Sequence, residues 1–99
     1  NVTSTKDDLV LNDYKLYQNY PNPFNPVTTI KYEIPKESIV NLKIYNILGE
    51  EVSVLVNQIQ KPGVHKTLFN ASHLASGVYF YRIMIDNKLV QTKKLMLIK

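Results

Sequence analysis

The chain contains no cysteine, which excludes disulfides, thiol redox regulation and zinc sites built on thiolates. It has only two histidines, and neither His65 nor His73 belongs to a His-Glu-x-x-His pattern or stands beside an acidic cluster. Its three glycines are isolated, so there is no phosphate-cradling loop. No apolar run approaches the ~20 residues that span a bilayer. We therefore expect no metal and no cofactor.

Arrangements typical of enzymes and nucleic-acid binders are also missing. Glu50 and Glu51 are adjacent, so in a strand their carboxylates would point to opposite faces and could not act as a pair. The serines lack the context of a nucleophile elbow. Tyrosines alternate with basic residues, but they fall in phase with aliphatic residues, which favours core packing over base stacking. We expect neither catalysis nor a nucleic-acid partner.

The net charge of +4 is unevenly distributed. Residues 1–87 carry eight basic and eight acidic side chains, so the surplus comes from Lys88, Lys93, Lys94 and Lys99. A basic terminus can meet an anionic surface such as lipid headgroups, nucleic acid or an acidic receptor. Lysines on an edge strand also discourage edge-to-edge pairing, and the sequence leaves both explanations open.

Apolar residues alternate with period two over most of the chain, which is the signature of half-buried strands. Ile30, Tyr32 and Ile34 share one face of such a run, and Pro35 ends it. The pattern predicts strands at 14–20, 29–34, 40–45, 51–56, 64–70, 78–85 and 88–98. Seven short strands with this spacing predict an all-β fold, namely a seven-stranded immunoglobulin-like antiparallel β-sandwich.

Some local patterns give more specific expectations. In the strand at 51–56, Val52, Val54 and Val56 alternate and should share one face. Tyr79 begins a core strand directly after a crossing loop, where a tyrosine corner bonds its hydroxyl to upstream backbone. Residues 1–13 are polar and lack periodicity, so we predict a linker there, an ordered domain over 14–99, and any export leader further upstream.

Three prolines lie between Tyr20 and Pro26, and they should make this segment stiff and mostly extended. One interpretation is an edge segment entering the sandwich, with Phe24 or Tyr20 plugging one end of the core. The other is a recognition epitope, because a segment that is already stiff loses little entropy on binding. From physical reasoning alone we favour the first interpretation.

The last predicted strand has apolar residues on both faces. Leu89, Leu95 and Leu97 fall on one face, and Val90, Met96 and Ile98 on the other. A strand buried on both faces would explain this pattern. So would an exposed edge strand that pairs with a partner, including a second copy of the chain.

Taken in order, these segments resemble the type A C-terminal sorting domain of the type IX (Por) secretion system of Bacteroidetes and related bacteria. The matching stretches are LYQNYPNPFNP at 16–26, IKYEIP at 30–35, VNLKIYNILGEEV at 40–52, FNAS at 69–72, LASGVYFYR at 74–82 and KKLMLIK at 93–99. Each motif is weak alone, but the ordered set is specific and covers residues 14–99 without a break. Residues 1–13 lie outside the match.

The resemblance implies a non-catalytic domain at the C-terminus of a secreted protein, covalently joined to an N-terminal cargo domain. It would direct the cargo from the periplasm through the outer-membrane translocon to the cell surface or the exterior. In some members a sortase-like protease removes the domain and joins the cargo to anionic lipopolysaccharide; in others the cargo is released. Cleavage would fall in the linker, where polar backbone is accessible.

By motif, the resemblance assigns recognition to Pro21, Asn22, Pro23, Gly77, Tyr79, Lys93, Lys94, Leu95, Met96, Leu97, Ile98 and Lys99. Gly77 and Tyr79 could act only by folding the domain. The alternative function is an immunoglobulin-like accessory module that binds carbohydrate or protein, or that spaces other domains. Carbohydrate binding predicts an exposed aromatic platform, whereas most aromatic residues here are expected in the core. A hydrolase would need a polar pocket, for which the sequence offers no candidate.

Overall fold

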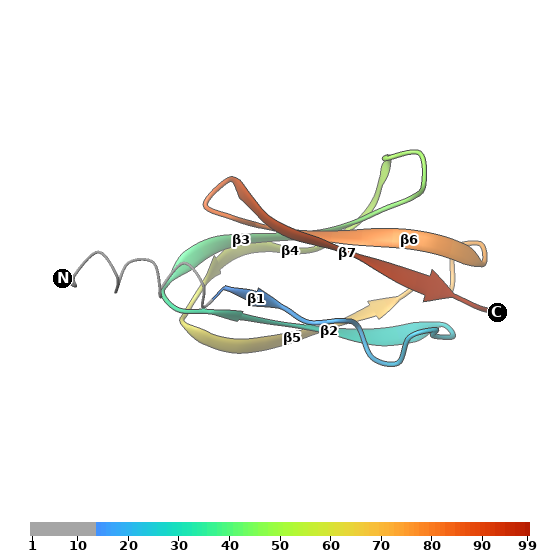
Figure 1. Ribbon diagram of the computed structural model, residues 1–99, viewed down its shortest axis with the longest axis horizontal. Helices are drawn as coiled ribbons and strands as arrows, with labels where there is room; N and C mark the ends of the chain where they lie inside the picture. Colours follow the sequence, from blue (N-terminus) through green and yellow to red (C-terminus); the bar gives the residue numbers. More distant parts are fainter. Residues whose placement is uncertain (1–13) are drawn as a thin grey trace.

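The computed structural model describes residues 14–99, and the predicted linker at 1–13 lies outside the described residues. Two antiparallel sheets pack face to face (Figure 1). One sheet has the order β1 (Lys15–Leu16), β2 (Val27–Ile34) and β5 (Gly63–Asn70). The other has the order β4 (Glu51–Gln60), β3 (Ser38–Tyr45), β6 (Gly77–Ile85) and β7 (Lys88–Leu97). The predicted seven-stranded sandwich is confirmed.

The fourth strand distinguishes this topology from that of a constant-type immunoglobulin domain. In those domains the fourth strand joins the sheet of the first, second and fifth strands. Here β4 pairs with β3 instead, which leaves β5 and β4 as edges on one side and β1 and β7 as edges on the other. No helix in the described part of the chain is long and apolar enough to cross a membrane.

The core contains the alternating residues that the sequence indicated. On β2, Ile30, Tyr32 and Ile34 are each at most 1% exposed. The inward faces of β3 and β6 are buried in the same way. Phe24 closes one end of the core with 2% exposure and packs 6.0 Å from Phe69, measured between ring centroids. Of the two residues that the sequence offered for closing this end of the core, Phe24 fills the position and Tyr20 does not.

The prediction that the three valines of β4 share one face was wrong. Val56 is 8% exposed, but Val54 is 46% exposed. The pairing of β3 with β4 runs from Leu42 opposite Val56 directly to Lys43 opposite Val54, which leaves Leu55 as an extra residue. A second shift before Tyr45 leaves Val52 without a partner. Each β-bulge reverses the side-chain alternation, so the valines cannot share one face.

The N-terminal strand is shorter than the predicted 14–20. Only Lys15–Leu16 is a strand, although the amide of Tyr17 still donates to the Lys31 carbonyl at 3.0 Å. The pairing is interrupted at Asn19, whose backbone amide donates to a side chain of the other sheet, and it resumes as a single bridge between Tyr20 and Thr29. The hairpin tip between β6 and β7 does fall where the sequence placed it, with Asp86 and Asn87 at φ values of 50° and 68°.

Candidate recognition site

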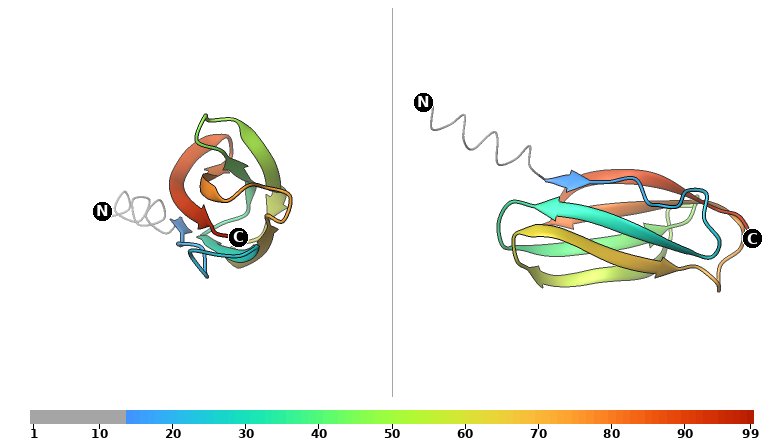
Figure 2. Two further views of the ribbon diagram at one scale, coloured as in Figure 1. Left: turned by 90° about the vertical axis from the view of Figure 1, so that its right-hand side faces the viewer. Right: turned by 90° about the horizontal axis from the view of Figure 1, so that it is seen from below.

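Three segments that lie far apart in the sequence meet at one end of the sandwich. They are the proline segment (residues 20–26), the crossing loop (residues 71–76) and the basic-apolar segment (residues 93–99). Figure 2 (right) shows the end of β7 beside the loop that joins β1 to β2. Two parts of the predicted recognition motif, about seventy residues apart, are thereby brought into direct contact.

Two buried polar side chains fix the start of the proline segment. Asn19 and Thr28 are 2% and 1% exposed. The side-chain Nδ2 of Asn19 donates to the Pro21 carbonyl and to Thr28 Oγ1, both at 3.1 Å, and the Thr28 hydroxyl donates to the same carbonyl at 2.8 Å. These bonds draw the chain inward at Pro21. The segment therefore bends over residues 21–23 and is not mostly extended as predicted.

Tyr81 anchors the residues that precede this bend. Its side chain is fully buried, and its hydroxyl donates to the Tyr17 carbonyl at 2.7 Å. The same oxygen accepts the backbone amide of Asn19 at 2.8 Å. Burial raises the pKa of Tyr81 to about 12, opposed by the hydrogen bond from Asn19. One phenol of β6 thus ties the two sheets together beneath the proline segment.

The proline segment pairs with the outer edge of β7. The amide of Phe24 donates to the Met96 carbonyl, and the amide of Ile98 donates to the Phe24 carbonyl, each at 3.0 Å. The side chain of Asn22 accepts the Met96 amide at 3.0 Å. One step earlier on β7, Gln18 Nε2 donates to the Lys94 carbonyl at 2.8 Å. The end of β7 is therefore not an open edge.

This pairing changes two expectations for the last strand. A second chain could pair with β7 between residues 94 and 98 only by displacing the proline segment. The strand is also not buried on both faces: Leu95 and Leu97 are at most 1% exposed, whereas Met96 and Ile98 are 38% and 52% exposed. A register shift between Gln91 and Leu89 leaves Val90 without a partner opposite it, which moves it off the predicted face of Met96.

The crossing loop is tied to both other segments, and its bond to the proline segment runs from the Ala71 amide to the Pro26 carbonyl at 2.8 Å. The Tyr79 hydroxyl donates to the Ala75 carbonyl at 2.7 Å, which confirms the predicted tyrosine corner. Gly77 has φ of +151°, a conformation that other residues rarely adopt, and a Cβ there would meet no atom within 4 Å. The need for glycine is therefore conformational. Lys99 closes the arrangement, because its backbone amide donates to Ser76 Oγ and its ammonium donates to the Ser72 carbonyl.

Exposure separates the predicted recognition residues into two groups. The residues at the surface are Pro21, Asn22, Pro23, Lys94, Met96, Ile98 and Lys99. The buried ones are Tyr79, Leu95 and Leu97, while Gly77 and Lys93 are half-buried. Only the first group has well-exposed side chains. Tyr79, Leu95 and Leu97 belong to the core beneath that surface.

Sequence reasoning missed the residues that position this site. Asn19, Thr28 and Tyr81 form its buried polar frame, and none was singled out as a site residue. A weak signal existed, because an asparagine just before a Tyr-Pro pair can bond to backbone two residues on. Tyr81 carried no such signal, since it falls in phase with core residues and only the fold shows what its hydroxyl contacts.

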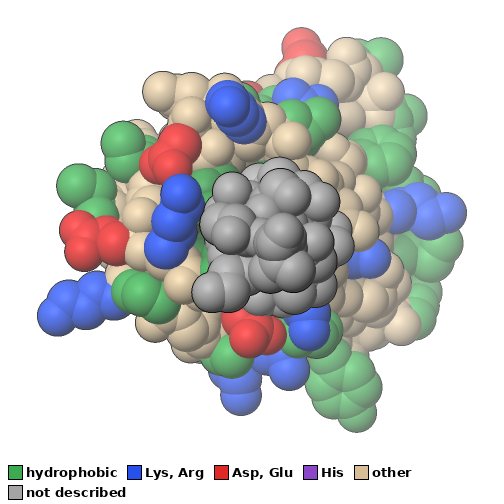
Figure 3. Space-filling model, turned by 60° about the vertical axis from the view of Figure 1, so that its left-hand side comes forward, with side chains coloured by type: hydrophobic (Ala, Val, Ile, Leu, Met, Phe, Trp, Pro, Cys, Tyr) green, Lys and Arg blue, Asp and Glu red, His purple; other side chains and the backbone are tan. Residues whose placement is uncertain are grey.

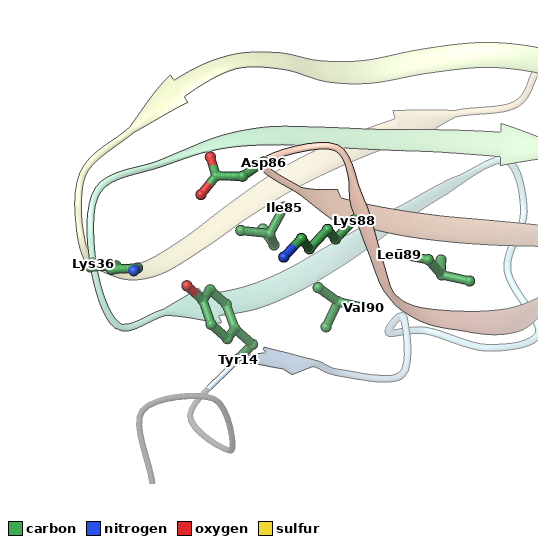
Figure 4. Close-up of a pocket in the computed structure, with 7 residues that line it drawn as sticks. All are labelled: Tyr14, Lys36, Ile85, Asp86, Lys88, Leu89 and Val90. Carbon is green, nitrogen blue, oxygen red and sulfur yellow. The ribbon is translucent and has the colours of Figure 1, made fainter. Parts of the chain in front are cut away.

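A hollow of about 380 Å³ lies at the opposite end, and the side chains that line it are shown in Figure 4. Its apolar lining comes from Tyr14, Ile85, Leu89 and Val90. Its one carboxylate, Asp86, already accepts the backbone amide of Ile39 at 2.9 Å. Acidic and basic side chains are interspersed around this end (Figure 3). Among residues 14–99, no group of three His, Asp or Glu side chains is placed to hold a metal ion.

Comparison with solved structures supports the sandwich fold. An immunoglobulin-like protein from Pseudomonas aeruginosa matches with a TM-score of 0.53 and 9% identity, covering 87% of this chain and 90% of its own. PorZ, a surface component of the type IX secretion system of Porphyromonas gingivalis, matches with a TM-score of 0.57 and 20% identity over 91% of this chain. The DNA glycosylase AlkC from Pseudomonas fluorescens matches with a TM-score of 0.57 and 11% identity over 88% of this chain. At these identities the likeness shows the fold alone.

The chain spans only part of two of these proteins, 31% of the glycosylase and 12% of PorZ. No curated protein matches the sequence. A family model described as "Secretion system C-terminal sorting domain" does match, over residues 18–99. That range contains all twelve predicted recognition residues. The chain therefore belongs to this family, the C-terminal sorting domains of type IX secretion.

Proposed function

We propose that residues 14–99 form an address that the type IX machinery reads as a folded surface. In this proposal the domain carries an attached N-terminal cargo from the periplasm through the outer-membrane translocon to the cell surface or the exterior. The observation that supports it most is the convergence of the proline segment, the crossing loop and the basic-apolar segment at one end. Because exposed residues of these segments lie on one surface, a single partner can contact them together.

The direct contacts would come from the exposed group of residues. Met96 and Ile98 offer apolar area, and Lys94 and Lys99 add positive charge beside it. Pro21, Asn22 and Pro23 give the surface a shape that the buried Asn19–Thr28 frame holds fixed. This combination suits a partner surface with an apolar centre and acidic groups around it. Gly77, Tyr79, Leu95 and Leu97 would act only by maintaining the fold.

The role needs no catalysis by this domain. If the cargo is separated from it, the cut would be made by a sortase-like protease of the system, in the linker at 1–13. The cargo would then be released or joined to lipopolysaccharide. A stable sandwich that begins at residue 14 is consistent with cleavage before it, because proteases need accessible backbone that can adapt to their active sites.

The strand β7 provides a matched pair of variants to test the contact surface. Lys94→Ser with Met96→Ser removes a lysine and an apolar residue at the proposed surface. Lys88→Ser with Leu89→Ser removes the same kinds of exposed side chain at the other end of the same strand. Leu89 is 59% exposed and Met96 38%, so neither variant should disrupt the core.

Each variant is fused behind a periplasmically exported reporter in a host with a working type IX system. The proposal predicts that the Lys94/Met96 variant leaves most reporter in the periplasm, while the Lys88/Leu89 variant is secreted like the unmodified domain. Thermal unfolding of both purified domains confirms that they are folded. Equal secretion of the two folded variants would contradict the assignment of this end as the contact surface.

A further inference from the structure

A groove of about 580 Å³ lies on the outer face of the three-stranded sheet, the face that Figure 2 (right) looks onto. It is lined by Tyr17, Gln18, Tyr20, Thr29, Lys31 and Lys66. The hollow at the far end has aliphatic side chains and a carboxylate in its lining, whereas this groove combines aromatic rings and ammonium groups with neutral polar side chains. It shares Tyr20 with the proline segment, but the sorting proposal gives no role to the residues that line it.

Two lysines face each other across the floor of this groove. Lys31 on β2 is directly opposite Lys66 on β5 in the strand register. Like charges in this position destabilise a sheet unless something neutralises them. The nearby carboxylate of Glu33 accepts the Tyr17 hydroxyl at 3.2 Å, and it forms no ion pair with either lysine. An anion bound between the two ammonium groups would relieve this repulsion.

The two tyrosines of the groove are held differently. The Lys31 ammonium lies 4.3 Å from the centre of the Tyr17 ring, so this cation is positioned by its neighbour. Tyr20 is 81% exposed, yet its backbone exchanges two hydrogen bonds with Thr29, both at 3.0 Å. An exposed aromatic ring on a fixed backbone loses little entropy when a ligand packs on it.

The neutral groups of the groove also narrow the choice of ligand. Gln18 Nε2 already donates to Asn19 Oδ1 at 2.6 Å and to the Lys94 carbonyl at 2.8 Å. The Oε1 atom of Gln18 remains free to accept a hydrogen bond, and the ligand would have to supply the donor. Thr29 Oγ1 can both donate and accept. A fully ionised carboxylate or phosphate only accepts, so a ligand that uses the whole groove needs hydrogen-bond donors as well as negative charge. Sugar hydroxyls meet this need and, like Thr29 Oγ1, both donate and accept.

We propose that this groove binds an acidic saccharide, a sugar chain bearing carboxylate, sulfate or phosphate groups. The anionic group lies between Lys31 and Lys66, and the apolar face of a sugar ring packs on Tyr20. Sugar hydroxyls then donate to Gln18 Oε1 and exchange hydrogen bonds with Thr29. The inference stands on the geometry of the groove and does not depend on the sorting function.

The test is NMR titration of isotope-labelled residues 1–99 with three probes. The first is an oligogalacturonate, the second a neutral oligosaccharide of equal length, and the third an oligoglutamate of equal charge. Lys66→Gln and Tyr20→Ala alter the groove without touching the core. Lys61→Gln is the matched control, an exposed lysine just before β5 and outside the groove.

The oligogalacturonate should shift the amide signals of the groove, and both groove variants should weaken binding about fivefold or more, as expected for loss of one charged or aromatic contact. Lys61→Gln should bind like the unmodified chain. Absence of shifts at millimolar probe overturns the proposal. So does equally tight binding of the neutral sugar or the oligoglutamate, which would show that the charge or the sugar is irrelevant. Unchanged affinity in both groove variants would place any binding elsewhere.

Discussion

The hydroxyl of Tyr81 offers a sharp test of how the recognition end is held together. Tyr81→Phe deletes one oxygen and leaves the ring in place, so no large cavity forms. The change removes the bond to the Tyr17 carbonyl and the bond from the Asn19 amide. Because Asn19 is only 2% exposed, its amide cannot readily turn to water instead.

The expected cost follows from these two bonds. Each contributes about 0.5–1.5 kcal/mol, and an unsatisfied buried partner costs roughly 1–3 kcal/mol. We therefore expect Tyr81→Phe to lower the free energy of unfolding by about 2–4 kcal/mol, or roughly 10–20 °C in Tm for a domain of this size. Tyr79→Phe loses a single bond to the Ala75 carbonyl and should cost about 1 kcal/mol. The exposed Tyr20→Phe should change stability by less than about 0.5 kcal/mol.

Urea unfolding followed by far-ultraviolet circular dichroism measures all three variants, and hydrogen exchange reports on the Asn19 amide directly. The account predicts the order Tyr81 > Tyr79 > Tyr20 in stability lost, with faster exchange at Asn19 in Tyr81→Phe alone. If Tyr81→Phe were no more destabilising than Tyr20→Phe, the hydroxyl would not be the anchor described here.

Three further predictions concern the same end and the core. Burial raises the pKa of Tyr32 and Tyr81 to about 12. Since unfolded tyrosine titrates near 10, the contribution of these two residues to the free energy of unfolding is complete below pH 10 and is lost as the pH rises towards 12. Urea unfolding at pH values across this range should show a falling free energy of unfolding, with a shallower fall in Tyr81→Phe, and a free energy that does not change with pH would contradict this prediction. Asn22→Ala should speed amide exchange at Met96 and cost about 0.5–1 kcal/mol, whereas the exposed Asn25→Ala should do neither. Gly77→Ala should cost about 1–3 kcal/mol from backbone strain, and a stability within 0.5 kcal/mol of the unmodified chain would refute that.

Much of the fold could be read from the sequence because the alternation is regular where strands pair without interruption. Ile30, Tyr32 and Ile34 were placed correctly for this reason, and so was the tyrosine corner at Tyr79. The sequence could not show which valines of β4 face the core, or on which face of β7 Val90 lies. A bulge inserts one residue relative to the partner strand, and its place depends on that partner, not on the bulged segment itself.

The candidate site was predictable as a set of segments but not as a surface. The sequence indicated the proline segment and the basic-apolar segment separately. The family resemblance grouped them as motifs of one domain but did not show that they are in contact. Their contact through Phe24, Asn22 and Met96 depends on which strands form the edges of the two sheets. The buried frame of Asn19, Thr28 and Tyr81 was missed because buried polar groups follow no periodic pattern.

The most direct test of the central claim is transport itself. A reporter exported to the periplasm is fused to residues 1–99 and expressed in two otherwise identical hosts, one with and one without a functional type IX translocon. The account predicts folded reporter outside the cells only in the first host. Retention of the folded fusion in the periplasm of both hosts, or equal release from both, would contradict the conclusion that this domain is a working type IX address.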